Sequence, residues 1–136
     1  MNVHFVKYDR STGRVLWAGF TQSEAIAGAD DVILLDSAVQ PESVRVVAGE
    51  VVPLPPKPSG FVKFDYAAGN WVPDEAAADT AARSQRNELL VQSDWTQLPD
   101  VPLDTKSAWA AYRQDLRDIT SQPGYPFDIV WPIPPQ

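Results

Sequence analysis

Apolar and polar residues follow each other in short runs over the first half of the chain, a pattern typical of small antiparallel strands. Turn residues interrupt the runs, and three of the interruptions predict hairpins. The expected strands cover 3–8 and 15–20 around Asp9–Gly13, 43–47 and 50–54 around Ala48-Gly49, and 61–66 and 70–72 around Ala67–Gly69. A short buried strand is also expected over 31–36. Residues 21–29 are ambiguous, because Ser23 is able to cap a short helix that Gly28 would end.

The pattern changes at Pro73, and the second half reads as helical. Residues 74–92 contain neither Gly nor Pro and are rich in good helix formers, which predicts a first helix. A second helix is expected over 105–121, with Asp104 or Thr105 as its cap. On that helix the apolar residues recur at spacings of three and four and predict one buried stripe. The members of the stripe are Trp109, Tyr112, Leu116 and Ile119.

Prolines divide the chain, because each one fixes φ and removes a backbone donor. Of the 13 prolines, most lie in a connector over 53–58 and in a C-terminal stretch over 123–135. The predicted fold class is therefore α+β. A small N-terminal antiparallel β module covers 1–72, and an α-helical hairpin with a proline-rich extended C-terminal tail covers 73–136. The tail is too apolar for a solvated terminus, so we expect it to lie on a surface, either its own helical hairpin or a partner.

Composition excludes several kinds of chemistry. The 136-residue chain has a net charge of −7, which opposes binding to the phosphates of nucleic acids. No apolar run approaches the roughly 18 residues of a membrane span, so no membrane contact is expected. With no Cys and one His, the sequence offers neither a thiolate metal site nor a nucleophile pair. We expect no catalytic residues, no metal and no cofactor.

The aromatic residues of the second half are the candidates for binding a protein partner. Trp and Tyr dominate the energetics of many protein interfaces, although a small domain also needs them for its core. Which of the five Trp residues are core stays open at this point. The candidate partner-binding residues are Trp95, Trp109, Tyr112, Tyr125, Phe127 and Trp131.

Four sequence elements of the second half occur together in a recognisable order. They are the Arg-x-x-Leu-Leu helix from Arg86, the SDWTQ loop over 93–97, the W-x-x-YR-x-x-LRD helix from Trp109, and the terminal Trp131-Pro132. Over about Ala82 to Pro135 the chain resembles the domain of bacteriophage tail assembly chaperone proteins. The first half, with YDRSTG over 8–13, resembles more loosely the N-terminal sheet module of tail fibre assembly proteins.

The resemblance implies a non-enzymatic function. Such proteins assist the folding, trimerisation or attachment of phage tail fibres, so the implied partner is a tail fibre or baseplate protein. The implied location is the host cytoplasm during assembly, with the virion tail as the alternative. Two other functions stay open: a structural virion component that remains bound at the fibre or baseplate, and a carbohydrate-binding adhesin module with aromatics on a flat sheet face. The oligomeric state is also open.

The residues that carry the resemblance have an expected role in the fold. We expect Asp94 to accept hydrogen bonds from backbone N–H groups of the inter-helix loop, and Trp95 to wedge between the helices.

Overall fold

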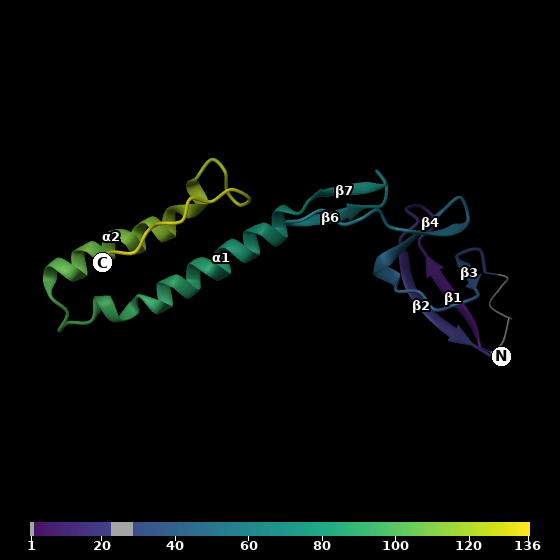
Figure 1. The fold of residues 1–136 in the computed structure, drawn as a ribbon, viewed down its shortest axis with the longest axis horizontal. Helices are drawn as coiled ribbons and strands as arrows, with labels where there is room; N and C mark the ends of the chain where they lie inside the picture. Colours follow the sequence, from purple (N-terminus) through teal and green to yellow (C-terminus); the bar gives the residue numbers. More distant parts are fainter. Residues whose placement is uncertain (1, 23–28) are drawn as a thin grey trace. The chain divides into compact units, whose positions relative to one another are not determined.

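The computed structural model describes residues 2–22 and 29–136 and divides the chain into two compact units. Residues 1–72 form what we call the N-terminal unit, and residues 73–136 form the C-terminal unit (Figure 1). The short helix predicted between Ser23 and Gly28 lies outside the described residues.

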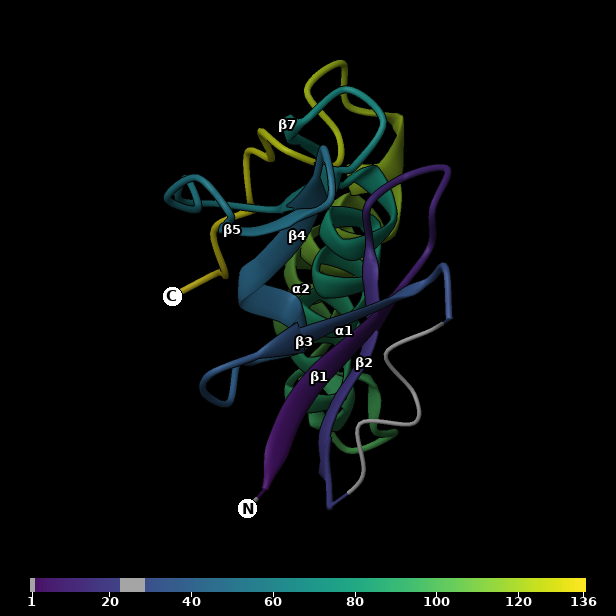
Figure 2. The same cartoon turned by 90° about the vertical axis from the view of Figure 1, so that its right-hand side faces the viewer.

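A three-stranded antiparallel sheet opens the N-terminal unit. Strand β1 (Val3–Tyr8) pairs with β2 (Val15–Thr21) on one side and with β3 (Val32–Leu35) on the other (Figure 2). The turn between β1 and β2 forms as predicted, because the Asp9 carboxylate accepts hydrogen bonds from the backbone N–H groups of Ser11 and Thr12. Strand β3 is half-buried, so the expectation of a buried strand there was wrong.

The second hairpin supplies the other side of this unit's core. A short 3₁₀ turn, η2 (Pro41–Ser43), leads into β4 (Val44–Val47), which pairs with β5 (Glu50–Pro53). The two-residue connection has Ala48 at φ 52° and Gly49 at φ 83°, the left-handed pair that matches the twist of the flanking strands. Buried valines of the sheet and the hairpin meet in one apolar cluster, formed by Val6, Val15, Val44 and Val46.

The third predicted hairpin is β6 (Val62–Asp65) with β7 (Asn70–Pro73). The Phe64 ring packs edge-on against Trp71, with 5.3 Å between the centroids, and the Arg45 guanidinium lies 5.2 Å from the Phe64 centroid. The Trp71 indole N–H donates to the carbonyl of Pro55, 3.0 Å away, which fixes the proline connector to this hairpin. All three hairpins were predicted, but they pair as three separate sheets.

Two helices form the C-terminal unit. Helix α1 spans Glu75–Gln92 and is capped by Asp74, whose carboxylate accepts from the Ala77 N–H at 3.2 Å. A 3₁₀ turn, η3 (Asp94–Gln97), precedes α2 (Leu103–Asp118), and η4 (Ile119–Ser121) extends α2.

The start of α2 differs from the prediction. The residue before the helix is Pro102, and it makes no side-chain cap. The predicted cap residues, Asp104 and Thr105, lie inside the first turn, so the capping prediction was wrong. The Asp104 carboxylate still faces the positive end of the helix dipole, which favours a negative charge there.

Helices α1 and α2 run side by side (Figure 1). Small residues of α1 and large residues of α2 make the buried face of this helical hairpin. Ala78 and Ala82 are 1% and 6% exposed, and their short side chains let the second helix approach closely. Three members of the predicted stripe, Tyr112, Leu116 and Ile119, are buried, whereas Trp109 is half-buried. The predicted α+β class is confirmed. Within residues 2–22 and 29–136, no helix is long and apolar enough to cross a membrane.

Candidate protein-binding surface

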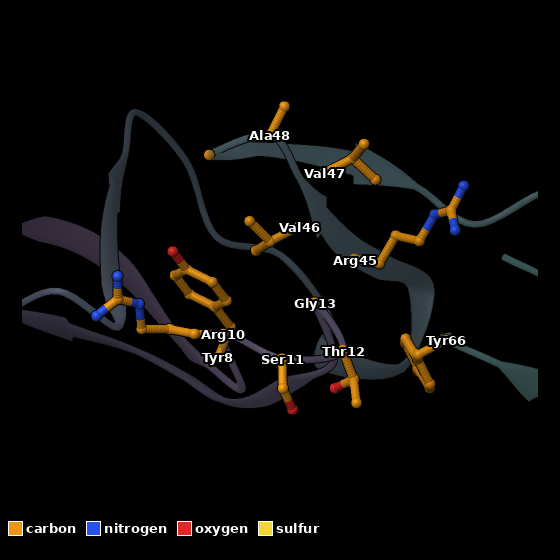
Figure 3. A pocket seen from close by; sticks show the side chains of 11 residues that line it. Tyr8, Arg10, Ser11, Thr12, Gly13, Arg45, Val46, Val47, Ala48 and Tyr66 are labelled. Carbon is orange, nitrogen blue, oxygen red and sulfur yellow. The ribbon is translucent and has the colours of Figure 1, made fainter. Parts of the chain in front are cut away.

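The N-terminal unit contains an open pocket of about 480 Å³ between the β1–β2 turn and the β4–β5 hairpin (Figure 3). Its two cations do not converge on a ligand, because Figure 3 shows the Arg10 and Arg45 guanidinium groups directed to opposite sides. Arg10 pairs with Asp30 at 3.1 Å, and Arg45 covers the Phe64 ring. Across the part of the chain that the structure describes, no group of three or more acidic or His side chains is placed to hold a metal ion. In the C-terminal unit, by contrast, several polar groups converge on one side chain.

Arg113 of α2 is the polar centre of the C-terminal unit. One terminal nitrogen, Nη1, donates to the Leu90 carbonyl at 2.6 Å and to the Ser93 hydroxyl at 2.7 Å. The other, Nη2, donates to the Asp94 carboxylate at 2.8 Å. The Arg113 side chain is only 11% exposed. Its charge therefore sits at the C-terminal end of α1, where the helix dipole favours a cation and the last carbonyls need donors.

The contacts of Arg113 correct the role that we expected for Asp94, and they link two of the sequence motifs. Asp94 was expected to accept from backbone N–H groups, but in the described residues its carboxylate pairs with Arg113, which lies 19 positions further along the chain. Ser93 and Asp94 of the SDW loop and Arg113 of the YR pair thus belong to one hydrogen-bonded cluster. Their joint occurrence in the sequence follows from this contact.

Replacing Arg113 by Lys is expected to lower the free energy of unfolding of the C-terminal unit by about 1–3 kcal/mol. An ammonium group keeps the charge but lacks the planar fork that reaches the three acceptors together. Thermal melts followed by helical circular dichroism measure the change. Arg117→Lys, on the exposed face of the same helix, is the control and should stay within about 0.5 kcal/mol of wild type. Equal melting of the two variants would contradict this role of Arg113.

Three aromatic rings stand in contact at the inter-helix loop, and we call them the aromatic row. Trp95 lies 5.8 Å from Trp109, and Trp109 lies 5.5 Å from Tyr112, measured between centroids. Exposure to solvent rises along the row: Tyr112 is 6% exposed, Trp109 is half-buried and Trp95 is 53% exposed. Trp95 was expected to wedge between the helices, and the structure instead leaves more than half of it in solvent. Its contact with Trp109 holds the exposed ring in place.

The C-terminal tail, residues 122–136, folds back on the helices of its own unit (Figure 1). The Gln122 amide binds both backbone groups of Val130, donating to the carbonyl and accepting from the N–H, each at 2.8 Å. Pro126, after the cis Tyr125-Pro126 bond, is buried. Further on, Pro134 lies beside Trp109 and Tyr112. The tail thus lies against its own helical hairpin, one of the two surfaces expected from the sequence.

A second attachment of the tail is electrostatic. The Tyr125 hydroxyl donates to the Asp79 carboxylate, and Arg83 also binds that carboxylate, at 2.8 Å. The hydrogen bond from Arg83, and after it the one from Tyr125, holds the pKa of Asp79 below its ordinary value of 3.8. The hydrogen bond to Asp79 raises the pKa of Tyr125 above its ordinary value of 10.0. Asp79 stabilises the fold as a carboxylate and Tyr125 as a phenol.

The attachment should therefore weaken at both ends of the pH range. Asp79 has a lowered pKa, so its contribution is complete above about pH 4 and is lost as the pH falls through the folded-state value. Tyr125 has a raised pKa, so its contribution is complete below about pH 10 and is lost as the pH rises through the folded-state value. Carbon-detected NMR titration of Asp79 checks the cause: Arg83→Gln should raise its pKa more than Tyr125→Phe does. An unchanged Asp79 titration in both variants would disprove the assignment.

The predicted partner-binding residues fall into two groups in the structure. Trp95 and Phe127 are more than half exposed, at 53% and 51%. Tyr112 is buried, Tyr125 is engaged with Asp79, and Trp109 and Trp131 are half-buried. The structure brings Trp95, Trp109 and Tyr112 together. Sequence reasoning missed Arg113 as the polar centre, Asp79 as the anchor of Tyr125, and Gln122 as the clamp of the tail. Only Arg113 had a signal, the YR pair of the resemblance.

Comparison with known proteins gives one finding for this chain. Residues 79–136 match the model of a family described as phage tail assembly chaperone protein. The chain has no significant match among curated proteins or solved structures. The matched region contains the Arg113 cluster, the aromatic row and the docked tail, and it indicates a role in phage tail assembly. The resemblance of the C-terminal region to the phage tail assembly chaperones, expected from its sequence, is thereby confirmed.

Proposed function

We propose that this chain is a non-enzymatic assembly factor that binds a phage tail fibre protein through the exposed end of its aromatic row. The family match supports a role in tail assembly and hence a protein partner. The observation that carries the proposal is Trp95, a large aromatic side chain held by Trp109 and still 53% exposed. A pre-positioned, solvent-facing Trp loses little freedom when a partner covers it, which is typical of a binding hot spot.

Aliphatic side chains near Trp95 in the sequence extend the candidate surface. Val91 at the end of α1 is 69% exposed, and Leu98 after η3 is 52% exposed. Both side chains lie outside the buried core of the unit. Together with Trp95 they favour a partner with an apolar surface, as expected of an incompletely assembled fibre protein.

The test is co-purification of the tail fibre protein encoded by the same phage. Trp95→Ala should melt within a few degrees of wild type, because the ring is largely outside the core, and should lose most of the captured fibre protein. Trp17→Ala is the matched control, since Trp17 of the N-terminal unit is 55% exposed. Capture by Trp95→Ala at the wild-type level would refute the proposal.

One observation favours carbohydrate binding as a second candidate function. Trp17 lies along β2 so closely over Gly19 that a Cβ there would be 2.7 Å from its ring, and the ring packs 4.9 Å from Phe5. An exposed indole is thus laid on a sheet face, the arrangement that a sugar-binding aromatic needs. A glycan array distinguishes the two functions, because Trp17→Ala should remove any sugar signal while leaving fibre capture unchanged.

Whether the factor leaves or stays is a separate question. An assembly factor that leaves is absent from purified particles, whereas a resident virion component is present in them at a fixed ratio. Mass spectrometry of purified particles separates these outcomes.

A further inference from the structure

The end of the tail borders an open space between the two helices of the C-terminal unit. Pro134 lines an open space of about 200 Å³ together with Leu89, Gln92 and Ser93 of one side and Trp109 and Tyr112 of the other. We call this space the tail groove. Pro134 remains exposed, so the chain's own tail leaves the tail groove open.

The walls of the tail groove suit a proline-rich ligand. The Trp109 and Tyr112 rings meet edge to face, at an interplanar angle of 87°, and present an aromatic corner to the tail. Aromatic-lined grooves are a recurring way in which proteins bind extended proline-rich segments. Such segments are stiff before binding, so they lose little conformational entropy when they dock.

After Val130, no hydrogen bond or ion pair attaches the described residues of the tail to the helices. The last hydrogen bond of the tail joins Val130 to Gln122, and in the described part of the chain no hydrogen bond or ion pair involves residues 131–136. Ile133 is 88% exposed. The terminal residues are thus held by apolar contacts alone, and Gln122 keeps the rest of the tail in place if they leave.

We propose that the tail groove binds a proline-rich extended segment of another protein, and that residues 131–136 are its built-in competitor. The tail supplies the evidence for the chemistry of the ligand, since Pro134, within the run Ile133-Pro134-Pro135, already lines the groove. This inference deepens the proposed function and rests on it, because it names the kind of segment that the assembly partner presents.

The test uses the full chain and a chain truncated after Val130, which retains the Gln122 clamp. Fluorescence anisotropy follows a labelled peptide with the sequence of residues 129–136, and a second peptide of repeated Ile-Pro-Pro units. The truncated chain should bind both peptides saturably, at least about tenfold more tightly than the full chain does. The control peptide carries Pro134→Ala and Pro135→Ala and should bind at least about tenfold more weakly. Because this control changes the ligand only, it leaves the protein's folding untouched.

If truncation prevents folding, the full chain with Pro134→Ala and Pro135→Ala is the second host, and the same binding order is expected. Equal binding of the proline and alanine peptides, or no binding to either host, overturns the proposal. Binding of the tail peptide without binding of the Ile-Pro-Pro peptide also overturns it, because the groove would then accept only this chain's own sequence.

The two proposals fail in different ways. If the fibre protein is captured but the tail peptide does not displace it, the groove proposal fails and the proposed function stands. If no fibre protein is captured while the peptides bind the truncated chain, the groove is a peptide-binding site and the proposed partner is wrong.

Discussion

Leu116→Ala should lower the free energy of unfolding of the C-terminal unit by about 2–5 kcal/mol, the usual cost of removing a fully buried leucine side chain. Leu116 is 0% exposed, and Ile119 and Tyr112 beside it on the same stripe are also buried. The substitution leaves a cavity at position 116. Arg113 and the tail hold the two helices together, so the helices are poorly able to move into that cavity. Against a total stability of roughly 5–15 kcal/mol, this loss is large.

The measurement is denaturant unfolding of the full chain followed by circular dichroism at the helical band, because α1 and α2 both lie in the C-terminal unit. Leu103→Ala is the matched control. It makes the same chemical change on the same helix at a side chain that is 75% exposed, and should alter stability by no more than about 0.5 kcal/mol. Similar losses in both variants would show that the stripe is not the core.

Gly13→Ala should destabilise the N-terminal unit by about 2–4 kcal/mol, for two separate reasons. Gly13 has φ +74°, a left-handed conformation that costs about 1–2 kcal/mol for a residue with a Cβ. A Cβ at this position would also lie 2.2 Å from the backbone carbonyl oxygen of Val46. The clash pushes β4 away and breaks the bond from the Val46 N–H to the Gly13 carbonyl, now 2.8 Å long.

Gly49→Ala separates the two contributions. Gly49 has a similar φ of +83°, but no atom lies within 4 Å of an added Cβ. This variant should lose only the conformational part, about 1–2 kcal/mol. Amide hydrogen exchange of Val46 reports on both variants, since its N–H bridges the two segments. If exchange at Val46 changes equally in the two variants, the contact between Gly13 and β4 carries no extra stability.

Local signals determined most of what the sequence predicted correctly. The β1–β2 turn depends on Asp9 and residues within five positions of it, and the β4–β5 turn on Ala48 and Gly49 alone. The first helix begins at Glu75, directly after its cap Asp74, and this cap is also a contact between near neighbours. Such interactions can be predicted from a short window because both partners lie inside it.

Contacts between distant residues account for most of the failures. Asp94 has its partner 19 positions away, and Tyr125 has its partner 46 positions away. The exposure of Trp95 depends on how the loop leaves α1, which the periodicity of either helix does not describe. The start of the second helix was missed for a local reason. We assumed a capping side chain, but the residue before the helix is Pro102, which provides none. How the predicted hairpins divide into three sheets likewise depends on packing between them.

The Gln122 clamp has a consequence for which amino acids the tail tolerates. Because the amide contacts only the N–H and the carbonyl of Val130, and the Val130 side chain is 76% exposed, the clamp selects a backbone and ignores a side chain. Related chains are therefore free to vary at this position, with one exception. Proline has no N–H to offer, so it is excluded at 130 although it is frequent on either side, at Pro126 and Pro132. The proline-free stretch between Pro126 and Pro132 thus contains the residue that Gln122 binds.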